Sequence, residues 1–176
     1  MKSESGSQAT SEVAHGSREA LESDLEARCI SVVVAGAHYA MHLDDVQEVI
    51  GLRPLTRVFH SPAAIAGVTS LRGDVLPVLD LGVLLGAGSS GRGVNARVLV
   101  VRDGSKRRAG LLVDALAGLR EIPEAGLEAL PSTLSPEVRE LSEGVIADSP
   151  ACVVLRVSAL LSASQITPTP VATGAD

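Results

Sequence analysis

Two aspartates that close apolar segments come nearest to a catalytic arrangement in this sequence. Asp80 precedes Leu81-Gly82, and Asp114 ends the apolar segment before it. Two facing carboxylates split their pKa values and can act as general acid and base, as in aspartic hydrolases. A retroviral-type aspartic protease carries Ser or Thr between the Asp and the Gly, and Leu81 supplies no hydroxyl group. We therefore predict that Asp80 and Asp114 are structural turn residues, and we keep an aspartic hydrolase only as a remote alternative.

Histidine and cysteine side chains are the next candidates, as metal ligands. His38 and His42 stand on one predicted strand, about 13 Å apart, which is too far for both to bind one ion directly. Cys29 and Cys152 lie in apolar, strand-like segments, where a free cysteine is commonly a small buried hydrophobe. We predict solvent-exposed histidines, buried cysteines and no metal site, and leave open whether the two cysteines interact.

Motifs for nucleophilic catalysis and for phosphate binding are absent from the sequence. It has no Gly-x-Ser-x-Gly segment, and the Gly-rich stretch 86–93 lacks the Lys of a phosphate-binding loop. The basic run 102–108 contains Asp103-Gly104, which predicts a hairpin tip with solvated charges. A β domain without a catalytic constellation is more often a binding module, so we predict neither enzyme activity nor a cofactor.

Composition limits the class of protein further. Apolar residues make up 45% of the 176 residues, but the chain has one Phe, one Tyr and no Trp, so Val, Leu, Ile and Ala must fill the core. The net charge of -6 argues against nucleic acid as a partner, because that backbone requires a basic face. No apolar run approaches the roughly 20 residues of a membrane span, and the N-terminus lacks the features of a signal peptide. We predict a cytoplasmic protein without direct membrane insertion.

Short apolar segments with turn residues between them predict an all-β chain with a few helical turns. The termini, 1–26 and 165–176, are predicted to be disordered tails around a domain at 27–164, although 19–28 could form a helical turn. No internal repeat is evident. The predicted strands are 29–35, 38–43, 67–71, 75–81, 97–102, 108–113, 115–122, 142–147 and 151–157, with helical turns at 81–85, 136–141 and 157–163. Residues 46–50 are predicted as either a short strand or a half-turn.

Side-chain alternation assigns faces to two of these strands. In 38–43, Tyr39 and Met41 are predicted to point inward and Ala40 outward. In 75–81, Pro77 cannot donate a hydrogen bond to a neighbouring strand, so it predicts an edge strand or a bulge. Val46 and Val49 share a short segment in which we expect one side chain in the core and the other exposed.

The stretch 67–81 reads Gly-Val-Thr-Ser-Leu-Arg-Gly-Asp-Val-Leu-Pro-Val-Leu-Asp-Leu. It resembles the segment Gly-Val-x-Asn-Leu-Arg-Gly-x-Val-hydrophobic-Pro-hydrophobic-hydrophobic-Asp-Leu of the CheW-like domain family. Tyr39, the segments 46–49, 97–101 and 110–114, and the apolar run 153–155 are similar to that family in order and spacing. The resemblance covers about residues 29–162. Three positions depart from the pattern: Ser70 replaces Asn, Gly82 stands where a long residue is common, and Ala40 replaces Gly.

The resemblance implies two side-by-side five-stranded β-barrel lobes, SH3-like in style, with short helices. It implies a non-catalytic adaptor that couples the regulatory domain of a CheA-type histidine kinase to the cytoplasmic tip of a methyl-accepting chemoreceptor. One lobe would bind the kinase, and a groove between the lobes would bind the receptor. An adaptor in a non-flagellar chemosensory pathway, such as gliding or pilus motility, is the alternative of the same fold.

Partner-binding residues follow from the same resemblance and from local geometry. By resemblance, Val46 and Glu48 belong to the receptor-facing surface. Arg72 is predicted at a tight turn, where its planar guanidinium suits a carboxylate of a partner or a carbonyl group of its own turn. Gly67 is predicted to allow close approach of a partner or of a neighbouring strand. The full predicted set is Val46, Gln47, Glu48, Gly67, Ser70, Arg72 and Gly73.

Overall fold

Ten β-strands and three short α-helices form the part of the chain that the computed structural model describes, residues 28–165. The predicted tails and the possible helical turn at 19–28 lie almost entirely outside the described residues. Most strands begin and end within two residues of their predicted positions. The strands are β1 (Arg28–Val34), β2 (Ala37–His42), β3 (Val46–Gly51), β4 (Ile65–Leu71), β5 (Asp74–Asp80), β6 (Arg97–Arg102), β7 (Arg108–Val113), β8 (Ala115–Glu121), β9 (Ser142–Ile146) and β10 (Cys152–Leu155).

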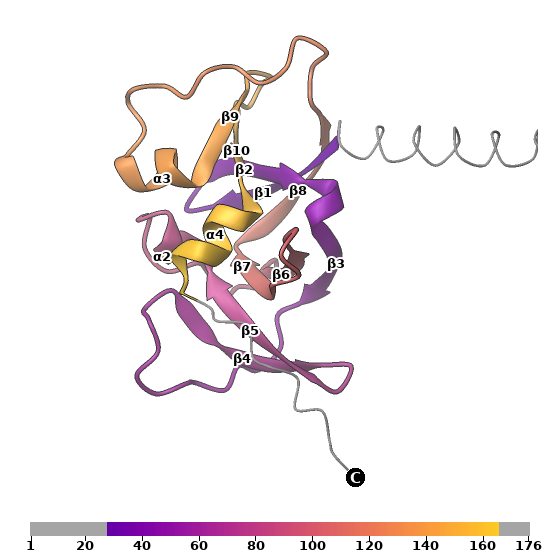
Figure 1. The fold of residues 1–176 in the computed structure, drawn as a ribbon, viewed down its shortest axis with the longest axis vertical. Helices are drawn as coiled ribbons and strands as arrows, with labels where there is room; N and C mark the ends of the chain where they lie inside the picture. The colour runs from indigo at the N-terminus through magenta and orange to yellow at the C-terminus, as the bar shows by residue number, and fades with distance from the viewer. Residues whose placement is uncertain (1–27, 166–176) are drawn as a thin grey trace, which may run out of the picture.

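The strands form two five-stranded sheets, which lie one above the other in Figure 1. Sheet A has the order β8-β1-β2-β10-β9, and sheet B has the order β3-β6-β7-β5-β4. Sheet B is built from one continuous stretch of chain, whereas sheet A combines the first two strands with the last three. The two sheets have the same strand order when β8, β9 and β10 of sheet A are numbered before β1 and β2. Each sheet also contains one parallel pair at the same place in that order, β10 with β2 in sheet A and β5 with β7 in sheet B. The repeat is therefore one of topology and not of sequence.

Each sheet curls until its two outer strands come close. An isolated bridge joins Thr56, which follows β3, to Val68 in β4, and another joins Glu128, which follows β8, to Val145 in β9. The prediction of two five-stranded lobes is confirmed. The barrels are not fully closed, because the two outer edges of each sheet are joined by one isolated bridge and not by a continuous ladder of hydrogen bonds.

The largest apolar cluster lies between the sheets. It combines β1 and β2 of sheet A with β5, β6 and β7 of sheet B and with helices from the C-terminal part of the chain. Separate clusters fill the interior of each lobe, and Ala40 belongs to the one inside sheet A, with none of its surface exposed. The outward orientation predicted for Ala40 is wrong, because the central strands are buried on both faces: one faces the lobe interior and the other faces the second lobe.

Pro77 lies in β5, an inner strand of sheet B. The parallel pairing of β5 with β7 begins at Val78, so the backbone at Pro77 is paired only with Val68 of β4. The predicted edge strand is therefore not found, but the register of β4 against β5 shifts between Ile65 and Gly67, one residue beyond the Val68–Pro77 pair.

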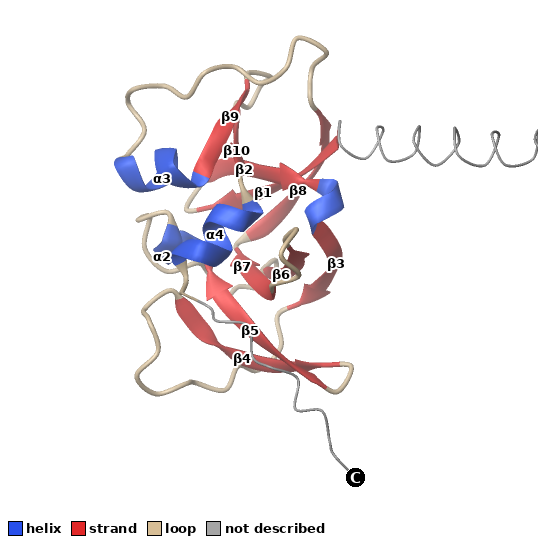
Figure 2. Ribbon diagram, viewed as in Figure 1, coloured by secondary structure: helices blue, strands red, loops and turns tan. Residues whose placement is uncertain are grey.

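Three α-helices, α2 (Leu81–Leu84), α3 (Pro136–Leu141) and α4 (Val157–Ala163), gather along one side of the seam between the sheets (Figure 2). A 3-10 turn, η1 (Leu43–Asp45), lies between β2 and β3. Ser135 caps α3 by accepting a hydrogen bond from the Val138 amide, and Pro136 occupies the first turn, where its missing N–H costs nothing. Arg107 fastens α4 to sheet B, because it pairs with Asp103 at 2.6 Å and donates to the Ser158 carbonyl at 3.2 Å.

Candidate partner-binding surface

Arg72 and Gly73 form the tight turn that joins β4 to β5. Both residues have positive φ angles, 53° and 90°, as in the two-residue turns that match the twist of antiparallel strands. Gly73 adopts this conformation at no steric cost, whereas Arg72 carries a side chain in the left-handed region. The turn therefore holds the Arg72 side chain at the end of the hairpin, where 75% of it is exposed.

An ion pair joins this turn to β3. A terminal nitrogen of Arg72 donates to Oε2 of Glu48 at 3.0 Å, and Glu48 is 23% exposed. The register of β3 against β6 shifts between Val46 and Glu48, so Gln47 is the extra residue of a β-bulge. Because the pair is solvated, it adds little stability, and its main effect is to aim the guanidinium.

Six of the seven predicted residues lie at this end of sheet B. Gln47, Ser70, Arg72 and Gly73 are exposed, Glu48 is half-buried, and Val46 packs against the main core. Val75, opposite Ser70 in the β4–β5 ladder, adds an apolar side chain that is 75% exposed. We did not predict Val75 as a surface residue, although an apolar side chain directly after a Gly-Asp turn was the available signal. We refer to Val46, Gln47, Glu48, Ser70, Arg72, Gly73 and Val75 as the turn surface.

Gly67 lies apart from the turn surface, near the start of β4, and is buried. Its φ angle is 149°, and a Cβ atom there would lie 2.7 Å from the Thr56 carbonyl oxygen. A glycine is thus required here because the segment around Thr56, which forms the closing bridge of the same lobe, approaches the backbone of Gly67. Gly144 of β9 stands at the matching position in sheet A, where a Cβ would lie 2.6 Å from the Leu127 side chain and 2.9 Å from the Glu128 carbonyl oxygen.

Asp80 is buried at the end of β5 and caps α2. Its carboxylate accepts hydrogen bonds from the Ser89 hydroxyl at 2.7 Å, the Ser90 amide at 2.8 Å and the Val83 amide at 3.3 Å. Burial alone would raise the pKa of Asp80, but the hydrogen bonds from Ser89, Ser90 and Val83 outweigh it and hold the pKa below its ordinary value.

Asp114 joins three segments at the junction of β7 and β8. Its carboxylate accepts from the Ala35 amide at 2.7 Å, in the turn between β1 and β2, and from the Gly91 amide in the Gly-rich loop. The Asp114 amide donates to the Val33 carbonyl at 3.0 Å. Asp80 and Asp114 thus accept from the adjacent Ser90 and Gly91 amides, and together they anchor the Gly-rich loop.

The cysteines and histidines that the structure describes show no catalytic grouping. Cys29 and Cys152 are buried free thiols, and burial raises the pKa of Cys29 to about 12. His42 contacts Glu143 across sheet A, and His38 is half-buried, so the predicted exposure of these histidines holds only in part.

Within residues 28–165, no three His, Cys, Asp or Glu side chains lie close enough together to hold a metal ion. The same residues contain no helix long and apolar enough to cross a membrane.

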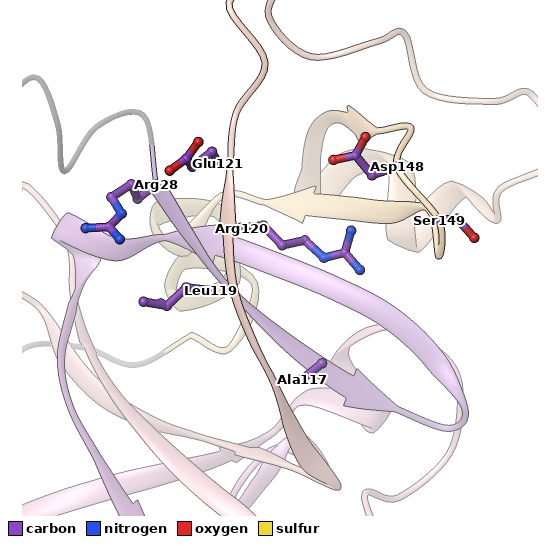
Figure 3. A pocket seen from close by; sticks show the side chains of 7 residues that line it. All are labelled: Arg28, Ala117, Leu119, Arg120, Glu121, Asp148 and Ser149. Atoms are coloured by element: carbon purple, nitrogen blue, oxygen red, sulfur yellow. The ribbon is translucent and has the colours of Figure 1, made fainter.

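A second surface, which the sequence reading missed, lies along β8. This strand is the outer strand of sheet A, and Leu116 and Leu119 on it are 41% and 56% exposed. Figure 3 shows Arg120 pointing to the side of β8 where the Asp148–Ser149 turn lies, while Leu119 points to the other side. An open depression of about 710 Å³ lies here, lined by Arg28, Ala117, Leu119, Arg120, Glu121, Asp148 and Ser149.

Comparison with known proteins matches the two-lobed fold to one family. The family model for the CheW-like domain matches residues 28–165. This chain belongs to the CheW-like domain family. It is 31% identical to the chemotaxis protein CheW of Rhizobium meliloti over 118 residues, which is 67% of this chain and 76% of the relative. It is 42% identical to protein FrzA of Myxococcus xanthus over 84 residues, which is 48% of this chain and 52% of that protein.

A solved structure supports the same assignment. The scaffolding protein CheW of Thermoanaerobacter tengcongensis superposes with a TM-score of 0.69 and 27% sequence identity, over 77% of this chain and 88% of that one. CheW family proteins are non-catalytic scaffolds, so this chain is a CheW-like adaptor in chemotaxis signalling and not an enzyme. The aspartic hydrolase alternative is therefore wrong, and both carboxylates instead serve as hydrogen-bond acceptors for backbone amides, including the adjacent Ser90 and Gly91 amides of the Gly-rich loop.

Proposed function

We propose that this protein binds the regulatory domain of a CheA-type histidine kinase and the cytoplasmic tip of a methyl-accepting chemoreceptor at the same time. The observation that carries the proposal is the Glu48–Arg72 pair, a charged hydrogen-bonding group held at a rigid turn on a non-catalytic scaffold. Both partners are cytoplasmic domains, and we propose a cytoplasmic location in association with receptor arrays.

The turn surface, at one end of sheet B, is the proposed receptor site, in place of the groove between the lobes that the family resemblance implies. Arg72 presents a planar set of donors suited to carboxylates, and Val75 supplies an exposed apolar contact beside it. Glu48 keeps the guanidinium in place before the receptor arrives, which lowers the entropy cost of binding. Gly67, also predicted as a binding residue, would act indirectly, because it lets the Thr56 segment close the lobe that carries the turn.

The β8 surface is the proposed kinase site. An outer strand with exposed leucines suits a partner that packs a second β domain against it. Arg28 and Arg120 line the neighbouring depression together with Glu121 and Asp148, so the rim offers both signs of charge. Placing the two proposed sites on different lobes lets one adaptor hold both partners without competition.

A non-flagellar chemosensory pathway is the second candidate. Its support is the likeness to protein FrzA of Myxococcus xanthus, which covers about half of this chain at 42% identity. The two candidates share the fold and the type of partner, and they differ in which kinase and which receptors the adaptor serves.

Calorimetric titration against regulatory domains of CheA-type kinases from the same genome tests the proposal. Binding with a Kd of about 10 µM or tighter, weakened by Leu119→Glu but unchanged by Arg72→Glu, is the expected result. Absence of binding to every such kinase would overturn the coupling proposal and leave the family assignment intact. Binding only to a kinase encoded with motility genes other than flagellar ones would favour the second candidate.

A further inference from the structure

The loop between β3 and β4 exposes the only phenylalanine of the chain. Phe59 is 88% exposed, and the neighbouring Val58 is 44% exposed. A large aromatic ring that contributes nothing to the core is a feature of protein-binding surfaces, where such rings supply contact area at low entropy cost.

Hydrogen bonds constrain this loop at its start and in its middle. The Ser61 hydroxyl donates to the Val58 carbonyl at 2.8 Å, and His60 between them has a φ angle of 61°. The Thr56 and Val68 amides each donate to the other residue's carbonyl, at 2.9 and 2.8 Å. The loop therefore presents the Phe59 ring from a preorganised backbone, which reduces the ordering cost on binding.

A depression of about 470 Å³ lies beside the Phe59 ring. The β3–β4 loop, the start of β4, helix α2 and the Gly-rich loop together form its wall. Its apolar lining includes Ile65 and Val83, and its polar lining includes Ser61 and Ser89. The space suits one or two side chains of a docked segment rather than a whole domain.

Two arginines line this depression on a protein of net charge -6. Arg57, His60 and Arg92 all line it and are exposed, and within residues 28–165 neither Arg57 nor Arg92 has an ion-pair partner. The one acidic lining residue, Asp80, already accepts three hydrogen bonds from its own turn. The charge of this site therefore calls for an anionic partner.

We propose that the Phe59 depression is a docking site for a short acidic segment of a partner protein. An apolar side chain of that segment packs on Phe59, and its carboxylates pair with Arg57 and Arg92. Nucleic acid fits less well, because a single aromatic ring and two arginines make neither a stacking platform nor a basic face.

This site is separate from the turn surface. The loop and the Leu71–Asp74 turn lie at opposite ends of the β4–β5 hairpin (Figure 1). The seven residues of β4 span about 20 Å at the usual rise per residue. The inference does not rest on the proposed function, and a third partner can occupy the site while receptor and kinase are bound.

Fluorescence anisotropy with a labelled synthetic peptide, a central Phe-Leu pair flanked by glutamates, tests the proposal on the full chain. Phe59→Ala and the double variant Arg57→Glu/Arg92→Glu should each weaken binding about tenfold or more, and added salt should weaken it further. The matched controls Leu119→Ala and Arg102→Glu change an exposed apolar residue and an exposed arginine elsewhere, and they should stay within about twofold of the parent. Thermal unfolding checks that every variant is folded.

Three results would overturn the proposal. The parent could bind the peptide no better than a matched peptide with lysines in place of the glutamates. The Phe59 and arginine variants could keep the affinity of the parent. Inorganic phosphate at millimolar concentration, or a single-stranded oligonucleotide, could displace the peptide from the arginines while Phe59→Ala had no effect. Arg72→Glu should leave peptide binding unchanged, so failure here and failure of the receptor proposal are distinguishable.

Discussion

At the scale of single residues, Arg72 combines an unfavourable backbone conformation with an exposed charged group. A non-glycine residue at a φ angle of 53° costs roughly 1 kcal/mol, and the solvated pair with Glu48 returns less than about 1 kcal/mol. Stability alone would favour Asn or Gly at this position. Because Arg72 contributes so little to the stability of the fold, we expect its side chain to act in binding.

Arg72→Glu should weaken receptor binding strongly while the domain stays folded. The new carboxylate would stand beside Glu48, repel it and present the wrong charge to the receptor. Arg72→Asn is the matched variant, since Asn tolerates the turn and removes only the guanidinium, so it should fold at least as well as the parent. Pull-down with receptor tips and thermal unfolding provide the two readouts, and parental receptor binding by both variants would contradict the assignment.

Asp80 makes a stability prediction with a defined pH dependence. Asp80→Ala leaves the Ser90 and Val83 amides without their acceptor, which should cost about 1–3 kcal/mol at neutral pH. The pKa of Asp80 is lowered in the folded state, so its contribution is present above the unfolded value near 3.8 and is lost as the pH falls through the folded value. Denaturant titrations from pH 7 to pH 2 should show the difference between parent and variant shrinking at the acid end. A difference that stayed constant with pH would argue against an ionised cap.

At the scale of elements, two glycines allow each curled sheet to close. Gly67 of β4 and Gly144 of β9 face the carbonyl oxygens of Thr56 and Glu128, which belong to the closing bridges of sheets B and A. Strand alternation predicts neither contact, because each depends on how far its sheet curls.

Gly67→Ala should destabilise the domain by about 2–4 kcal/mol, because the methyl group would meet backbone at 2.7 Å and the φ angle is unfavourable for alanine. Gly51→Ala is the matched control: it lies in β3, no atom approaches within 4 Å of the added Cβ, and its cost should stay below about 0.5 kcal/mol. Urea denaturation measures the free energy of unfolding of both variants. Equal losses of stability would show that the Thr56 segment shifts to accommodate the methyl group.

At the scale of the whole molecule, the shared core couples the lobes. The largest cluster takes residues from both sheets and from α4, which contributes the fully buried Leu160. Leu160→Ala should lower the stability of both lobes by about 2–5 kcal/mol in a single unfolding transition. Hydrogen exchange should then accelerate in β5 and β7 as well as in β1 and β2. Two separated transitions, with only sheet A affected, would show that the lobes fold independently.

The N-terminal segment provides a second whole-molecule prediction. We proposed from composition that residues 1–26 lie outside the folded domain, and the family match begins at residue 28. Deletion of residues 1–24 should therefore shift the Tm by less than about 2 °C, since a change of that size is below about 1 kcal/mol for a domain of this length. A clear drop in Tm would place part of this segment among the contacts of the domain.

The sequence by itself determined where the strands lie along the chain, because alternation of side chains and turn glycines are local properties. The Arg-Gly turn, the turn at Asp80 and the family motif at 67–81 could be recognised for the same reason. Only the tertiary structure decided that Ala40 is buried, that Arg72 meets Glu48, and that Phe59 stands exposed beside Arg57 and Arg92. These features join segments far apart in the chain, and their positions follow from the curl of each sheet and from the packing of one lobe on the other.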